Sequence, residues 1–203
     1  MRIAVVGAGN VGTAIGAGWA GKGHRVVYGV RDPKRNGAPD HRAVGEAVTD
    51  AEVIALCVTA QAVEGALRDC GDLTGKILID PTNPLAPDEG GLKLSMGFDT
   101  SLAEFIAART TARVVKALNQ VGAAVLGDTS GFACKPVQFV ASDDPEAKQV
   151  VRGLVEDLGF EVFDAGPLKA ARLLEPMAMV WIDQAMRYGM SPDRAWALME
   201  RHK

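Results

Sequence analysis

Three glycines with the spacing Gly-x-Gly-x-x-Gly, at Gly7, Gly9 and Gly12, are residues that could hold phosphate groups. They follow an apolar run and precede small residues in a helical pattern, which is the context in which this motif binds a dinucleotide. The first glycine allows a tight turn, the second lets a pyrophosphate approach the backbone, and the third lets the helix pack on the strand. The phosphates then meet free N–H groups at a helix N-terminus. The motif predicts a dinucleotide site that includes Asn10 and Val11, and the alternative is a glycine-rich turn without a ligand.

A second informative position lies about 20 residues beyond this motif, where an NAD site usually carries an acid for the ribose 2′-hydroxyl. Here the chain has Val30 and Arg31. A guanidinium pairs bidentately with a phosphate, whereas an acid repels one, so the pattern favours NADP. Lys34 and Arg35 are candidates for the same pocket. Asp32 favours NAD if a shift of one residue brings its carboxylate to the ribose, and Arg31 could instead be a solvated loop charge.

The composition is that of a globular protein with one main core. The chain has 203 residues, 48% of them hydrophobic, and a formal net charge of -3. Its basic residues are scattered and its aromatic residues are few, which argues against a nucleic-acid partner. The first strand begins at Arg2 and no apolar run is long enough to cross a bilayer, so we expect a cytoplasmic protein without a membrane segment. The cysteines and histidines lack metal-ligand spacing, so we expect no metal and reduced thiols, with Cys57 in a core strand.

Apolar, β-branched runs alternate with helical patterns along the chain, which is typical of a parallel sheet covered on both faces. We expect strands at residues 3–6, 26–28, 53–58, 76–79, 113–117, 137–140 and 161–163. We expect helices at residues 10–21, 43–49, 60–69, 101–108, 123–126 and 145–158. The predicted fold is an α/β, doubly wound, Rossmann-type sheet, mostly parallel, formed by residues 1–167.

Residues 80–100 form the longest segment without periodicity. The segment follows the fourth predicted strand, and ligands of open α/β sheets bind at the carboxyl ends of such strands. We therefore expect residues 81–84 to be functional and residues 88–97 to be mobile.

The chain from Leu168 onward is apolar in a helical pattern that Pro176 interrupts. We expect a kink or a restart at this proline and a second short helix after Ser191. The extension, residues 168–203, is expected to close the cofactor cleft or to form a homodimer interface. Its Met and Trp residues either line a flat cofactor or pack in a core or subunit interface.

Several segments together resemble the NADP oxidoreductases that depend on coenzyme F420, a family that includes the cytosolic domain of the six-transmembrane ferric reductases. The glycine motif is shared by many Rossmann proteins, whereas the segments at residues 114–122, 157–160 and 164–168 followed by 171–176, in this order, are much more particular to the family. The matching segments span nearly the whole chain and lie at residues 7–12, 29–31, 75–85, 114–122, 157–160, 164–168 and 171–176.

This resemblance implies that NADPH lies along the carboxyl edge of the sheet, with the deazaflavin over the nicotinamide in a cleft closed by the C-terminal helices. Family members often have Ser or Thr beside the strand-two arginine. Here that position is Val30, so the preference for NADP depends more heavily on Arg31. The residues implied beside the adenosine half are Val58, Thr59 and Ala60, and those implied around the nicotinamide are Asn83, Pro84 and residues 119–123, including Asn119 and Ala123.

The expected activity is hydride transfer between NADP(H) and coenzyme F420 or a flavin-like acceptor such as FMN or FAD. No catalytic acid, base or nucleophile is expected, because the cofactors carry the chemistry and the protein positions them. A flavin or ferric reductase is a close variant. Two alternatives are an NADPH-binding redox sensor without turnover and an imine or carbonyl reductase, whose longer helical domain we do not expect in this chain. Arg172 could meet the anionic tail of the deazaflavin, or it could cap a helix or pair with a neighbour.

Overall fold

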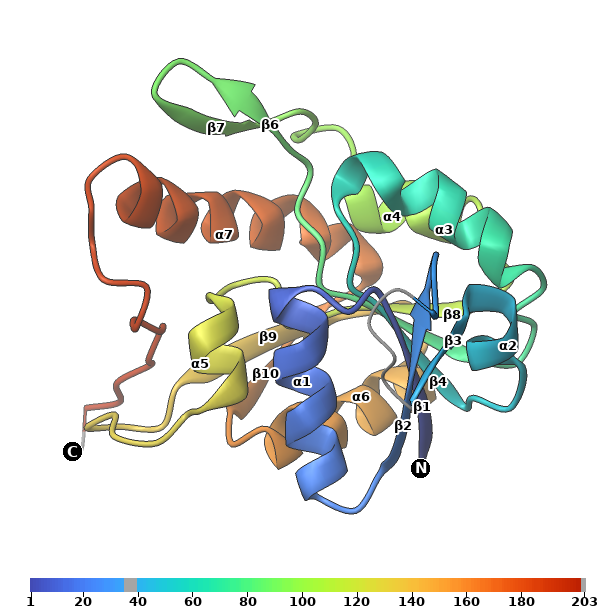
Figure 1. The fold of residues 1–203 in the computed structure, drawn as a ribbon. Helices are drawn as coiled ribbons and strands as arrows, with labels where there is room; N and C mark the ends of the chain where they lie inside the picture. The colour runs from blue at the N-terminus through green and yellow to red at the C-terminus, as the bar shows by residue number, and fades with distance from the viewer. Residues whose placement is uncertain (35–39, 202–203) are drawn as a thin grey trace.

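The computed structural model describes residues 1–34 and 40–201, which form an α/β fold around an eight-stranded sheet (Figure 1). The strand order is β10-β9-β8-β5-β4-β1-β2-β3, and neighbours are parallel except for β8 and β9. The strands are β1 (Arg2–Val6), β2 (Arg25–Val30), β3 (His41–Ala43), β4 (Val53–Leu56), β5 (Ile77–Asp80), β8 (Arg113–Lys116), β9 (Val137–Ala141) and β10 (Glu161–Gly166). The chain leaves β1 toward β2 and later returns to β4 on the other side, so the order reverses beside β1. The predicted doubly wound, mostly parallel sheet is confirmed.

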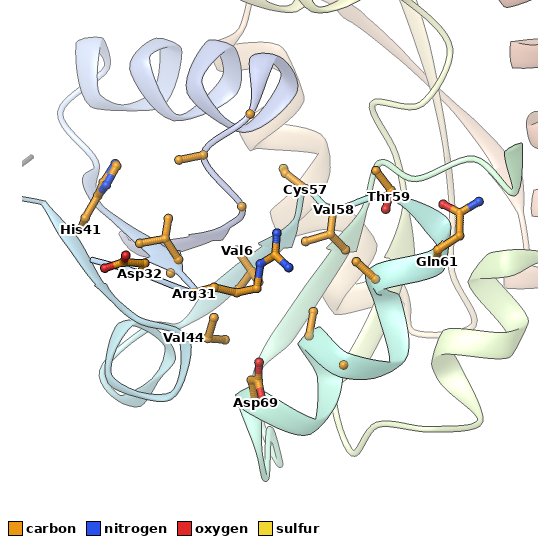
Figure 2. A pocket seen from close by; sticks show the side chains of 18 residues that line it. Val6, Arg31, Asp32, His41, Val44, Cys57, Val58, Thr59, Gln61 and Asp69 are labelled. Carbon is orange, nitrogen blue, oxygen red and sulfur yellow. The ribbon is translucent and has the colours of Figure 1, made fainter. Parts of the chain in front are cut away.

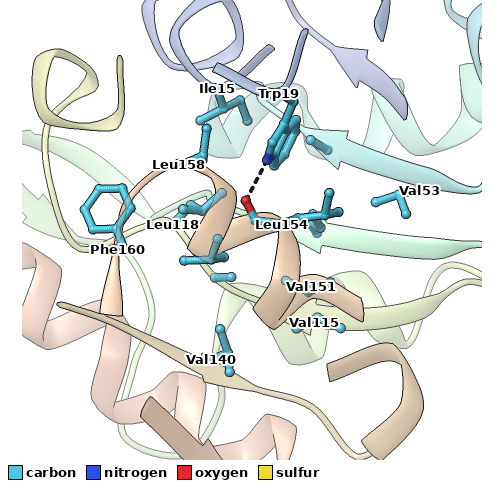
Figure 3. Close-up of a cluster of buried hydrophobic side chains, with 14 of the residues drawn as sticks. Ile15, Trp19, Val53, Val115, Leu118, Val140, Val151, Leu154, Leu158 and Phe160 are labelled. Atoms are coloured by element: carbon cyan, nitrogen blue, oxygen red, sulfur yellow. Dashed lines mark hydrogen bonds between the residues drawn. The ribbon is translucent and has the colours of Figure 1, made fainter. Parts of the chain in front are cut away.

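Both faces of the sheet are buried under helices, which explains why the central strands are apolar throughout. One face is covered by α1 (Asn10–Gly21), α5 (Ala123–Gly127) and α6 (Pro145–Asp157), and the other by α2 (Val44–Thr49), α3 (Val63–Cys70) and α4 (Leu102–Ala107). Trp19 of α1 is fully buried, and its indole Nε1 donates a hydrogen bond to the Leu154 carbonyl of α6 at 2.8 Å (Figure 3). This contact ties the helix that follows the glycine motif to the rest of its layer.

Residues 88–94, expected to be mobile, instead contribute to an antiparallel hairpin of β6 (Leu85–Asp88) and β7 (Gly91–Leu94). Gly90 in its turn has φ +70°, a conformation that glycine adopts without strain. Arg187 holds the turn, donating to the Glu89 carbonyl at 2.7 Å and pairing with Asp88 at 3.5 Å. Because Arg187 lies about 100 residues further along the chain, periodicity within the segment could not reveal this contact.

The C-terminal region also departs from expectation. Helix α7 (Ala171–Met186) continues through Pro176, so of the two expectations, a kink or a restart, the restart is wrong. Buried residues on both sides of the proline, Leu174 and Ala178, hold the helix against the core. No helix follows Ser191 within described residues 191–201. In this segment the carbonyl of Trp196 accepts a hydrogen bond from the Val137 N–H at 2.9 Å. The indole Nε1 of Trp196 donates to the carbonyl of residue 120 at 3.1 Å.

The short edge strand β3 was not predicted, because its three residues carry no apolar run. The other predicted elements are present, with ends shifted by at most three residues. Within the described residues, none of the helices combines the length and the apolar content that crossing a bilayer requires.

Candidate dinucleotide site

The three motif glycines have the geometry that their spacing predicted. Gly7 has φ +101°, and its N–H donates to the Gly29 carbonyl at 2.9 Å. A Cβ on Gly7 would overlap the Cys57 carbonyl, and one on Gly12 would overlap the Gly7 carbonyl. At Gly9, by contrast, a Cβ would meet no atom within 4 Å. The first and third glycines therefore let protein segments pack closely, whereas the second leaves open space.

That open space lies at the start of α1, where Gly9 is the N-cap residue and provides no side-chain hydrogen bond. The first N–H groups of this 12-residue helix therefore have no side-chain cap. Asn10, Val11 and Gly12 form its first turn. A helix N-terminus of this kind attracts an anionic group through its N–H donors and its dipole.

A cavity of about 900 Å³ extends from the glycine loop over the carboxyl ends of β1, β2 and β4 (Figure 2). Its walls come from the glycine loop, the end of β2 and the segment from β4 into α3. The residues that line it are Val6, Gly7, Ala8, Gly9, Gly29, Val30, Arg31, Asp32, His41, Val44, Cys57, Val58, Thr59, Gln61, Ala62, Gly65, Ala66 and Asp69. The reversal of strand order beside β1 is where doubly wound sheets bind their ligands.

Arg31 extends from the end of β2 into this cavity, with its guanidinium directed toward Val58 (Figure 2). Its side chain is exposed and makes no hydrogen bond or ion pair with any residue that the structure describes. Asp32 also lines the cavity but lies on the His41 side, and its carboxylate accepts a hydrogen bond from the Lys34 N–H at 3.1 Å. The cavity thus contains a cation that has no partner among the described residues and a carboxylate that supports the adjoining turn.

The remaining candidates around the adenosine half are placed differently from one another. Val58 and Thr59 line the cavity, whereas Ala60 begins a 3₁₀ turn (Ala60–Ala62) and is not part of the lining. Lys34 is exposed and also outside the lining, and Arg35 lies outside the described residues. Sequence reasoning missed His41, Gln61 and Asp69, for which no motif exists.

Cys57 follows β4 rather than lying within it, so its expected place in a core strand was wrong by one residue. Burial raises the pKa of its thiol well above the usual range. The thiol is therefore a poor nucleophile even though it lines the cavity.

Asn83 and Asn119, proposed from the family resemblance, are brought together at the carboxyl edge of β5 and β8. Asn83 Nδ2 donates to the Asn119 carbonyl at 3.0 Å, and Asn119 Nδ2 donates to Asn83 Oδ1 at 3.0 Å. Pro84 is buried beside this pair, and Ala123 begins α5. None of these four residues lines the cavity at β2, so they mark a second part of the same sheet edge.

A buried charge cluster that sequence reasoning missed lies directly beneath this edge. The fully buried Lys116 Nζ lies 3.0 Å from Asp80 Oδ2 and 2.9 Å from Glu175 Oε1. Asp80 and Lys116 are opposite each other in the register of β5 and β8. A signal was present in the sequence, because two apolar strands each end in a charged residue at the same sheet edge.

Arg172 forms a bidentate ion pair with Glu104 of α4, at 2.8 and 2.7 Å. This hydrogen bonding lowers the pKa of the Glu104 carboxyl, and burial opposes the shift only in part. Of the alternatives for Arg172, the pairing with a neighbour is therefore the one that the structure shows.

Comparison with known proteins gives a consistent picture. The family model for "NADP oxidoreductase coenzyme F420-dependent" matches residues 2–84. A protein from Arthrobacter sp. FB24, named by inference an F420-dependent NADP reductase, is 31% identical, with a TM-score of 0.83 over 93% of this chain and 95% of that one. The metalloreductase STEAP3 of Rattus norvegicus is 29% identical over 184 residues, which are 88% of this chain.

This chain spans only 36% of the length of STEAP3. An imine reductase from Streptomyces aurantiacus is 18% identical with a TM-score of 0.66, over 93% of this chain and 63% of that one. At this identity the likeness shows a shared fold only. The similarity to the Arthrobacter protein, in contrast, extends over nearly the whole of both chains at 31% identity. The chain belongs to the family of coenzyme F420-dependent NADP oxidoreductases.

Proposed function

We propose that this protein binds NADPH and transfers a hydride between it and coenzyme F420 or a similar flat, flavin-like acceptor. The observation that carries the proposal is Arg31, an exposed cation without a protein partner among the described residues, directed into the cavity that begins at the glycine loop. Such a guanidinium suits the 2′-phosphate that distinguishes NADPH from NADH.

The residues present fit this cofactor. The uncapped N-terminus of α1 and the open space at Gly9 suit a pyrophosphate, and Val58 and Thr59 offer an apolar and a hydroxyl side chain to the adenosine half. A dinucleotide crosses the point where the strand order reverses, so its other half belongs over β4, β5 and β8. At about 4.8 Å between strands, β5 lies roughly 10 Å from β1 and β8 roughly 14 Å. This spacing supports the Asn83–Asn119 pair as the nicotinamide end of the site.

When bound, NADPH supplies the hydride, and the protein contributes orientation and exclusion of water. Asn83 and Asn119 are hydrogen-bonded to each other, which gives this part of the site a defined shape. Trp181 packs where a Cβ of Gly122 would lie, and this packing fixes the adjoining loop against α7. Each of these roles is a positioning role.

The test is to mix the purified protein with NADPH and coenzyme F420, with FMN, FAD and no acceptor in parallel. Loss of the deazaflavin absorbance together with NADPH oxidation, and only with F420, would support the proposal. Oxidation with FMN or FAD at an equal rate would instead indicate a flavin reductase. Tight NADPH binding without oxidation by any of these acceptors would contradict hydride transfer to a flat acceptor and favour a sensor or a different substrate.

A further inference from the structure

A closed ring of hydrogen bonds joins β5, β8 and α7 beneath the Asn83–Asn119 pair. On the β5 side, Asp80 Oδ1 accepts from the backbone N–H of Thr82 at 2.9 Å and also from its hydroxyl. Thr82 precedes Asn83, whose side chain bonds to Asn119. Asn119 Nδ2 also donates to the Leu174 carbonyl of α7 at 3.1 Å.

The ring closes through the next residue of α7. Glu175 Oε1 accepts from Lys116 Nζ at 2.9 Å, and Lys116 in turn donates to Asp80 and to the Thr82 carbonyl. Glu175 also accepts from the backbone N–H groups of Leu102 at 3.0 Å and Ala103 at 3.2 Å, at the start of α4. Lys116 belongs to β8, and its single ammonium group therefore links this strand to the end of β5 and to α7.

Burial gives this ring its rigidity. Lys116 and Asp80 are 0% exposed and Glu175 is 1% exposed, so water does not compete for their hydrogen bonds. In such surroundings an ion pair that loses one partner leaves an uncompensated charge, which is strongly unfavourable. The three side chains consequently have little freedom to separate. Their hydrogen bonds to the N–H and the carbonyl of Thr82 also hold the backbone of that residue in place.

We propose that Lys116, Asp80 and Glu175 are positioning residues for the nicotinamide half of the site. The inference rests on the proposed function, and it adds that α7 sets the shape of this edge through Glu175 and the Leu174 carbonyl. The cluster lies beneath the Asn83–Asn119 pair and acts through it. None of the three side chains is among the residues that line the β2 cavity.

Glu175→Gln is the main test, because it keeps the shape of the side chain and removes one of the two carboxylates that hold Lys116. Glu104→Gln is the matched control, since it makes the same change in the α4–α7 ion pair outside the ring. Thr82→Val is a second variant that removes only the hydroxyl bond to Asp80. It remains informative if the glutamine variant does not fold.

Three quantities are measured for each protein: the Kd of 2′,5′-ADP, which lacks the nicotinamide half, the Kd of NADPH, and the single-turnover rate of F420 reduction. For Glu175→Gln we expect the Kd of 2′,5′-ADP to change by less than about twofold and the rate to fall by about tenfold or more. The ratio of the Kd of 2′,5′-ADP to the Kd of NADPH, which is the affinity advantage of NADPH, should also decrease. Thr82→Val should show a smaller effect in the same direction, and Glu104→Gln should resemble the wild-type protein.

The inference is wrong if folded Glu175→Gln keeps both the wild-type rate and the wild-type advantage of NADPH. Equal losses of 2′,5′-ADP and NADPH affinity would also overturn it, because they would indicate a general structural role. Failure of the proposed function gives a different result, namely no F420 reduction by the wild-type protein. In that case the ratio of the two affinities still tests the ring, because it needs no acceptor.

Discussion

Replacing Arg31 with alanine should weaken NADPH binding by roughly 30-fold and leave NADH binding nearly unchanged. Arg31 lines the cavity and has no hydrogen bond or ion pair among the described residues, so its removal should cost the fold little. The two cofactors differ by the 2′-phosphate alone. A selective loss of NADPH affinity would therefore assign the guanidinium to that group.

The magnitude follows from the exposure of the side chain. A hydrogen bond to a charged group contributes about 1.5–3 kcal/mol, and bidentate pairs lie toward the upper end of that range. Arg31 is exposed, so solvent and salt screen part of the attraction. We therefore take about 2 kcal/mol, which corresponds to the roughly 30-fold change in Kd.

The assay is a titration of wild-type protein and Arg31→Ala with NADPH and NADH at low and at high salt. Arg25→Ala is the matched control, because Arg25 is an exposed arginine at the opposite end of the same strand. Raising the salt concentration should weaken NADPH binding more for the wild-type protein than for Arg31→Ala. Equal losses of NADPH and NADH affinity, or an equal effect of Arg25→Ala, would refute the assignment.

Gly9→Ala should leave the melting temperature nearly unchanged but weaken NADPH binding by about tenfold or more, because its Cβ would enter open space at the start of α1. Gly12→Ala should instead lower the melting temperature by overlapping a backbone carbonyl, and the reverse pattern in thermal melts and titrations would contradict both assignments. Leu173 is 73% exposed on α7, and we expect a homodimer that Leu173→Glu dissociates; a monomeric wild-type mass by light scattering would disprove this. Arg172→Ala should lower the melting temperature at neutral pH more than in acid. Arg172 lowers the pKa of Glu104, so the stabilisation is present above the ordinary glutamate pKa and is lost as pH falls through the lowered value; equal losses at both pH values would count against it.

Much of the fold was predictable because local patterns and global packing agree. The central strands are apolar on both faces because helices cover both faces, and α1 begins and ends at the residues that the glycine motif and its periodicity predicted. The failures occur where distant residues decide the outcome. Arg187 holds the β6–β7 turn, and Trp196 bonds the non-helical C-terminal segment to Val137 and to the carbonyl of residue 120.

In the candidate site, too, local patterns were predictable and contacts between distant residues were not. The glycine motif and Arg31 were identifiable because one short segment carries the whole signal, namely spacing, a preceding strand and a following helix. Asn83 and Asn119 were reached through resemblance to a family, and only the fold shows that their side chains bond to each other. The ring beneath them was not predicted, because Asp80, Lys116 and Glu175 lie on three separate elements.

The sequence by itself determined the doubly wound α/β class, the phosphate-binding turn and the cation at the end of β2, because each depends on a local pattern of residue types. The tertiary structure decided which polar side chains are buried together. Asp80 and Lys116 each end an apolar strand, but only the register of β5 and β8 places them opposite each other, and only the fold brings Glu175 of α7 to the same point. A buried ammonium is tolerated only where carboxylates and carbonyls surround it, and only the folded chain brings those groups together.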